Sequence, residues 1–140
     1  MGRSTTSVRL ADDLRVDLAS AAAAESTTVT ELIERFVREG LACAAHPGIV
    51  FKPGPSGRRA ALAGGPDVWE IAAALRDVAG SEAARVDVLA DQFGLHGRQI
   101  VMALNYAADR RDEIETRIAA NDRALERAER VAAERDRLLA

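Results

Sequence analysis

The chain of 140 residues has little of what disulfide-bonded, zinc-bound or membrane proteins require. Its one cysteine, Cys43, excludes an intramolecular disulfide and a cysteine-rich zinc centre. No apolar run approaches the roughly 18 residues of a membrane span. The N-terminus lacks the basic and then apolar pattern of a signal peptide. These absences favour a cytoplasmic protein that has no membrane partner.

Patterns that would support catalysis are also missing. The sequence has no nucleophile paired with a base, no cluster of His and Glu, and no glycine-rich phosphate loop at a credible spacing. Its two histidines, His46 and His96, have no cysteine near them in sequence and fall short of a zinc site. We therefore expect a protein that is not an enzyme and that holds no cofactor or metal.

What the chain does have is alanine and arginine. Alanine supplies 29 residues and hydrophobic residues make up 48 % of the chain, which suits closely packed helices. Lys52 is the one lysine beside 18 arginines, yet the net charge is −3. Because the overall charge does not attract nucleic acid, any DNA binding must use a local face.

Residues 1–45 show the pattern of a strand followed by two helices. Residues 5–10 alternate, with Thr6, Val8 and Leu10 on one side, which predicts a short strand. A helix begins near Asp12, and the segment 25–27 interrupts the helical pattern. Thr28 and Glu31 then form the pattern of a capping box, which predicts that a second helix begins there.

A lone strand ahead of two short helices predicts a dimer. The strand needs a partner for its backbone groups, and about 45 residues make too small a core alone. In a two-fold dimer the strands pair antiparallel and the helices share one core. The expected shared core is Val8, Leu10, Leu14, Leu18, Ile33, Phe36 and Val37.

The segments TTSVRLADDL and TVTELIERFV, within residues 4–42, resemble the ribbon-helix-helix family of the Arc and MetJ type. The resemblance implies that a two-stranded ribbon enters the major groove and reads bases. It also implies that the start of the second helix holds a DNA phosphate. The chain departs from many members at Ala11, where they have proline. The implied base contacts are Thr5, Ser7 and Arg9, and the implied phosphate contacts are Thr28, Val29 and Thr30.

Residues 46–109 predict a β-hairpin, a helix and a helix-turn-helix. The segments 49–52 and 58–62 flank a turn rich in Pro and Gly, and a helix follows Asp67. The spacing of Leu89, Gly94 and Ile100 is typical of a helix-turn-helix. Residues 46–108 resemble the small homeodomain-like domain of VapB-type antitoxins. The second helix of this motif either contacts DNA or forms a packing or partner surface, and we favour the second role. Its expected exposed residues are His96, Arg98, Gln99, Met102 and Asn105.

Residues 110–140 contain no Gly or Pro and predict one long charged helix. Apolar residues recur at alternating spacings of four and three, although Asn121 and Arg135 interrupt them. This helix either packs partly on its own domain or lies in a groove of a partner. The expected fold is therefore mainly α: a ribbon-helix-helix in a dimer, then a hairpin with a helix-turn-helix, then a C-terminal helix.

The two resemblances together imply an antitoxin of a type II toxin–antitoxin pair. Such a protein represses its own operon by binding operator DNA as a homodimer or higher even oligomer, and it neutralises a toxin, here a PIN-like ribonuclease. The alternatives are a stand-alone ribbon-helix-helix repressor and a structural protein that oligomerises through its last helix. The expected toxin contacts are Trp69, Tyr106, Ile114, Ile118, Leu125, Arg127, Arg135 and Leu139.

Overall fold

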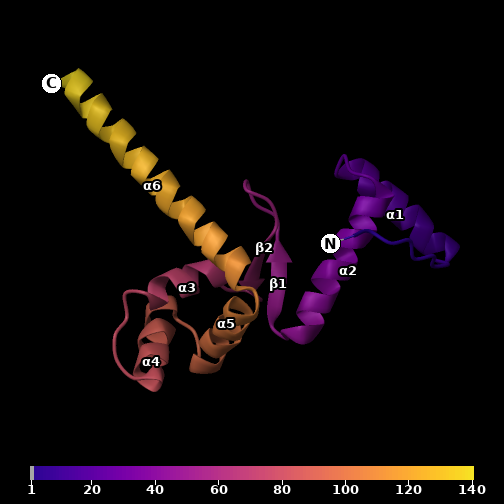
Figure 1. The fold of residues 1–140 in the computed structure, drawn as a ribbon, viewed down its shortest axis with the longest axis horizontal. Helices are drawn as coiled ribbons and strands as arrows, with labels where there is room; N and C mark the ends of the chain where they lie inside the picture. Colours follow the sequence, from indigo (N-terminus) through magenta and orange to yellow (C-terminus); the bar gives the residue numbers. More distant parts are fainter. Residues whose placement is uncertain (1) are drawn as a thin grey trace. The chain divides into compact units, whose positions relative to one another are not determined.

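The computed structural model describes residues 2–140 and divides into two compact units (Figure 1). The first unit ends at Ala42 and the second begins at Cys43, so the division falls inside a helix. The segments 46–109 and 110–140, which we expected as separate parts, belong to one unit. A mainly helical chain with one small antiparallel hairpin is confirmed.

The first unit contains helices α1 (Asp12–Ala24) and α2 (Val29–Ala45). Leu18, Ala22 and Leu32 are buried together, and the half-buried Leu10 and Ile33 pack against them. Between the helices, Ser26 has a positive φ of 53°, which lets the chain turn sharply after α1. The N–H of the next residue, Thr27, donates to a carbonyl of α1. The core of this unit is therefore very small.

Residues 2–10 contain no strand, in contrast to the strand that the alternation predicts. A β-strand exists only when a second strand accepts and donates its backbone hydrogen bonds. Within residues 2–42 no such partner strand is present. The two-stranded ribbon would need a second chain and stays a prediction.

The second unit begins with a hairpin of β1 (Ile49–Lys52) and β2 (Arg59–Leu62). The strands are antiparallel, with Ile49 opposite Leu62 and Lys52 opposite Arg59. Helix α3 (Val68–Leu75) follows, and then α4 (Glu82–Phe93) and α5 (Gly97–Asp109) form the expected helix-turn-helix. Gly94 ends α4 with a φ of 64°, a left-handed conformation that glycine adopts without strain.

Helix α6 (Arg111–Leu139) completes the second unit, and only its beginning contributes to the core. Ile114 and Ile118 are buried, whereas every residue from Asp122 to Arg130 is exposed. Figure 1 shows α6 extending far beyond α3, α4 and α5. The buried apolar residues of this unit are Ile49, Ala60, Ala61, Leu62, Val68, Ile71, Leu89, Ile100, Ala103, Tyr106, Ile114 and Ile118.

Candidate nucleic-acid and partner interfaces

The side chains expected to touch DNA bases are accessible in the structure. Thr5, Ser7 and Arg9 are all exposed on the extended segment before α1. In the same segment Leu10 packs against the core of the first unit, whereas Val8 is 73 % exposed. The polar side chains of this segment are therefore free to meet a ligand, and the single chain covers its apolar side chains incompletely.

The residues expected to form a shared dimer core fall into two groups. Leu18 is buried, and Leu10 and Ile33 pack against it within the single chain. The other four are exposed, although they are large and apolar. Large apolar side chains that stay exposed in a single chain are candidates for burial against a second chain. These four are Val8, Leu14, Phe36 and Val37.

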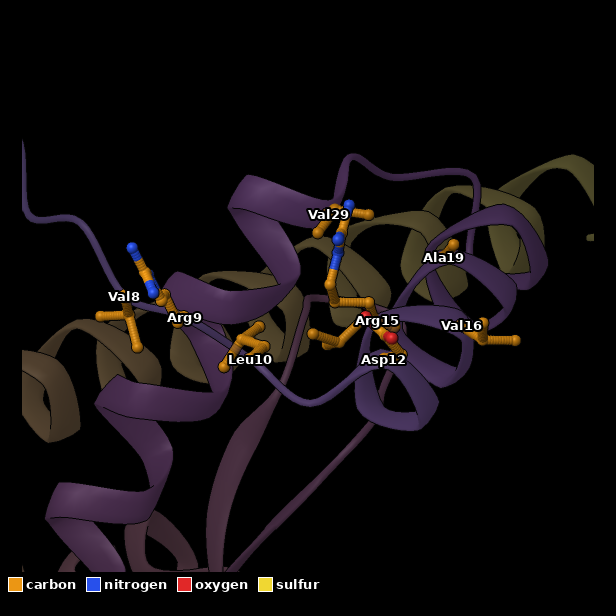
Figure 2. Close-up of a pocket in the computed structure, with 9 residues that line it drawn as sticks. Val8, Arg9, Leu10, Asp12, Arg15, Val16, Ala19 and Val29 are labelled. Atoms are coloured by element: carbon orange, nitrogen blue, oxygen red, sulfur yellow. The ribbon is translucent and has the colours of Figure 1, made fainter.

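An open groove of about 890 Å³ lies between the N-terminal segment, α1 and the start of α2 (Figure 2). Figure 2 shows Arg15 reaching from α1 toward Val29 at the beginning of α2. The groove places a guanidinium beside a helix N-terminus, where an anion is doubly favoured. Arg15 is not among the DNA contacts expected from the sequence, although Asp12, Arg15, Val16 and Ala19 have the spacing of one helical face.

The start of α2 has the capping box that the sequence predicts. The N–H of Glu31 donates to the Thr28 hydroxyl at 3.1 Å, and the N–H of Thr28 donates to the Glu31 carboxylate at 3.2 Å. Among the described residues, none accepts a hydrogen bond from the N–H of Val29 or Thr30. These two donors are the ones that a phosphate would use.

Glu31 itself adds a negative charge at this helix start. Its carboxylate accepts hydrogen bonds from the hydroxyls of Thr27 and Thr28 at 2.8 and 3.1 Å. These bonds, that of Thr27 first, hold the pKa of the Glu31 carboxyl below its usual value. A phosphate that approaches Val29 and Thr30 therefore meets a nearby carboxylate, and Arg15 offsets that charge.

Three of the residues expected to bind a partner lie inside the second unit. Tyr106 is 1 % exposed, and Ile114 and Ile118 are also buried. The Tyr106 ring meets the rings of His46 and Phe51 edge-on, with centroids 5.2 and 6.4 Å away. These side chains belong to the core of the second unit and present no surface to a partner.

Trp69 lies at an open cleft of about 920 Å³ between the hairpin turn, α3 and α6. Its indole N–H donates to Asp67 at 3.2 Å, and Arg59 forms an ion pair with the same carboxylate. The ring is half-buried, so one part of it packs and another is accessible. The ion pair of Arg59 with Asp67 had no signal in the sequence, since it depends on the turn that brings Asp67 back beside Ala61 of β2.

The helix-turn-helix presents fewer free side chains than the sequence suggested. Gln99 accepts a hydrogen bond from the N–H of His96 at 2.9 Å and so serves as a helix cap. Met102 lies against Gly48, where a Cβ would overlap its methyl group. His96, Arg98 and Asn105 are exposed. A single arginine on this face gives little phosphate neutralisation, which favours a packing role for α5.

The outer half of α6 carries the remaining expected partner residues. Leu125, Arg127, Arg135 and Leu139 are all exposed. Arg135 forms an ion pair with its neighbour Asp136 at 2.8 Å, and both side chains are largely in solvent. Such an exposed pair stabilises the chain little. Arg135 can therefore leave Asp136 and pair with a carboxylate of a partner instead.

Within residues 2–140, no three His, Cys, Asp or Glu side chains gather as they would around a metal ion. None of the helices in this range has the length and apolar character needed to cross a lipid bilayer. No family model matches the chain, and neither the curated proteins nor the solved structures gave a match.

Proposed function

We propose that this protein is an antitoxin that represses its own operon. In this proposal a dimer of the first unit binds operator DNA, and the second unit neutralises a toxin, a PIN-like ribonuclease. The family is proposed from the resemblances described above. The role of each unit is proposed from the residues that it exposes. The observation that carries the proposal is the exposed apolar surface of the first unit beside its exposed polar segment.

The first unit supports the DNA-binding role in three ways. Val8, Phe36 and Val37 are 73 %, 47 % and 56 % exposed. A second copy of the chain would bury the apolar surface that these side chains leave in water. Pairing two copies of residues 5–10 would also satisfy their backbone groups. It would leave Thr5, Ser7 and Arg9 together on one ribbon face, where Arg can read guanine.

The groove at the start of α2 supports a phosphate contact on each side of such a ribbon. Arg15, together with the N–H groups of Val29 and Thr30, offers one charge and two donors at one place. Contacts of this kind position a protein on the duplex without reading its sequence. Base contacts by the ribbon would then supply the specificity.

The second unit supports the toxin-binding role through the outer half of α6. Most residues of this half are exposed, yet it keeps apolar residues such as Leu125, Val131 and Leu139. A helix in water gains stability mainly when its apolar face is covered. A groove of a partner protein would cover it, and Arg127 and Arg135 would then face carboxylates such as those of a metal-dependent nuclease.

The test of this proposal is co-expression with the product of the adjacent gene. The full chain and a chain that ends at Asn121 are compared by pull-down and by binding to the upstream DNA. The cut at Asn121 keeps the buried Ile114 and Ile118, so the second unit retains its core. We expect the shortened chain to bind DNA as the full chain does and to lose the co-expressed protein.

The outcomes separate the alternatives. Specific binding of DNA with no retained protein partner would support a stand-alone ribbon-helix-helix repressor. Failure of the full chain to bind any DNA would contradict the repressor role and favour a structural interaction protein. Retention of the partner by the shortened chain would place the neutralising surface before residue 122.

A further inference from the structure

The outer half of α6 repeats itself every seven residues. Each repeat has an acidic residue, then an arginine, then two apolar residues. Positions seven apart stay close to one line along a helix, so each kind of residue forms its own column. The acidic column is Asp122, Glu129 and Asp136, the basic column is Arg123, Arg130 and Arg137, and the apolar pairs are Ala124 with Leu125, Val131 with Ala132, and Leu138 with Leu139.

This arrangement disfavours a second copy of α6 as the occupant of its apolar face. In a parallel pair, Arg135 would lie in the seam opposite Arg135 of the second copy. In an antiparallel pair, the acidic columns of the two helices would lie along the same edge of the seam and repel each other. Both arrangements place like charges together, so a different protein is a better partner for α6 than a second copy of α6.

The apolar face of α6 continues into the cleft beside Trp69. Ala124 and Arg127 line that cleft, and they also line a shallow groove of about 420 Å³ farther along α6. The groove runs over Ala128, Val131 and Ala132 to Arg135. The two hollows therefore form one surface, which begins at the hairpin turn and ends near the C-terminus.

The charged residues that line the groove along α6 are both positive, Arg127 and Arg135. The cleft at Trp69 has mixed charges: Asp67 is paired with Arg59, and Glu70, Asp112 and Glu113 also line it. Arg127 makes no hydrogen bond or ion pair within residues 2–140. Arg127 and Arg135 are eight residues apart, which is about 12 Å along the helix at 1.5 Å per residue.

We propose that the Trp69 cleft and this face of α6 form one continuous docking surface for an acidic, amphipathic segment of another protein. The segment places apolar side chains over Ala124, Ala128 and Val131 and carboxylates near Arg127 and Arg135. An apolar side chain at its end enters the cleft at Trp69. This inference rests on the proposed function, because it takes the toxin as the partner and states which chemistry on the toxin is bound.

The experiment measures the affinity of full-length variants for the purified product of the adjacent gene. Arg127→Glu and Arg135→Glu should each weaken binding about tenfold or more, because both face the carboxylates. Arg130→Glu is the matched control, since it makes the same change at an arginine that lines neither the cleft nor the groove. It should change the affinity by less than about twofold.

The cleft is tested separately by placing a charge in it. Ala124→Glu should weaken binding about tenfold, whereas Ala133→Glu, on another side of the helix, should have little effect. Circular dichroism of each variant shows whether α6 remains helical. Both control positions lie on the exposed part of α6, so the second unit keeps its core.

The results distinguish this inference from the proposed function. If the partner binds all the variants equally well, the docking surface is wrong and the antitoxin role stands. If the full-length wild type does not retain the partner, both are overturned. If Arg127→Glu and Arg135→Glu weaken DNA binding instead, the surface belongs to a nucleic acid and the inference is wrong.

Discussion

The hydroxyl of Tyr106 donates a hydrogen bond to Glu113 Oε2 at 3.0 Å and so joins α5 to the first turn of α6. Burial raises the pKa of this hydroxyl, and the Glu113 carboxylate raises it further, so the phenol stays a donor. The contact ties the helix-turn-helix to the long helix within one unit. It also removes Tyr106 from the surface where the sequence suggested a partner contact.

Substitutions of Tyr106 should therefore change stability rather than partner binding. Tyr106→Phe loses one hydrogen bond and should cost about 1 kcal/mol. Tyr106→Ala leaves a cavity beside His46 and Phe51 and should cost roughly 3–5 kcal/mol. The measurement is urea unfolding followed by the fluorescence of Trp69, the one tryptophan, which lies in the same unit. Equal stabilities of the wild type and Tyr106→Ala would contradict the packing described here.

A charge at Val8 should abolish the dimer of the first unit. Val8→Asp would place an unpaired carboxylate in the shared core, at a cost of several kcal/mol, about the penalty for an uncompensated buried charge. Light scattering after size exclusion should show a monomer. Arg9→Ala, on the polar side of the segment, is the control and should remain dimeric. A well-folded wild-type monomer at micromolar concentration would refute the shared core.

Two arginines of the first unit should affect DNA binding differently. Arg9→Ala should lose roughly 1–3 kcal/mol of binding free energy and relax the preference at one base pair. Arg15→Ala should weaken binding to all sequences alike. The slope of log affinity against log salt concentration should fall by about the value expected for one phosphate contact. Fluorescence anisotropy with variants of the upstream DNA, at several salt concentrations, measures both effects. An unchanged affinity of Arg9→Ala for every DNA variant would show that the segment does not read bases.

Ser26→Gly should stabilise the first unit. Ser26 has a φ of 53°, a conformation that costs a residue with a Cβ about 1 kcal/mol and that glycine adopts freely. The control is Ser20→Gly in the exposed middle of α1, which should instead destabilise the helix by roughly 0.5 kcal/mol. Thermal unfolding by circular dichroism at one protein concentration compares the two variants. A lower melting temperature for Ser26→Gly than for the wild type would contradict the turn geometry.

The cap of α2 should weaken in acid. The bonds from Thr27 and Thr28 lower the pKa of Glu31, so its ionised form is favoured by folding. That contribution is complete above the pKa of an unfolded glutamate, about 4.3, and is lost as the pH falls through the lower folded value. Carboxyl NMR titration should give a higher pKa for Glu31 in Thr27→Ala than in the wild type. Identical titration midpoints would show that Thr27 does not hold the carboxylate.

Local signals in the sequence determined most of the helices and the hairpin of this protein. The capping pair Thr28 and Glu31, the turn glycine Gly94 and the turn between residues 52 and 59 act over a few residues, so the sequence displays them directly. The columns of α6 are also local, because helical spacing alone aligns them. A mainly α chain with one hairpin follows from these features without any knowledge of distant contacts.

Only the tertiary structure decided which apolar residues are core and which are surface. Ile114 and Leu125 belong to the same stripe in the sequence, yet the first is buried against the rest of its unit and the second is exposed. Helical spacing gives the direction of a side chain but not the length over which a neighbour covers the helix. Likewise, Arg15 approaches Val29, and Asp67 pairs with Arg59, only because turns bring separate segments together.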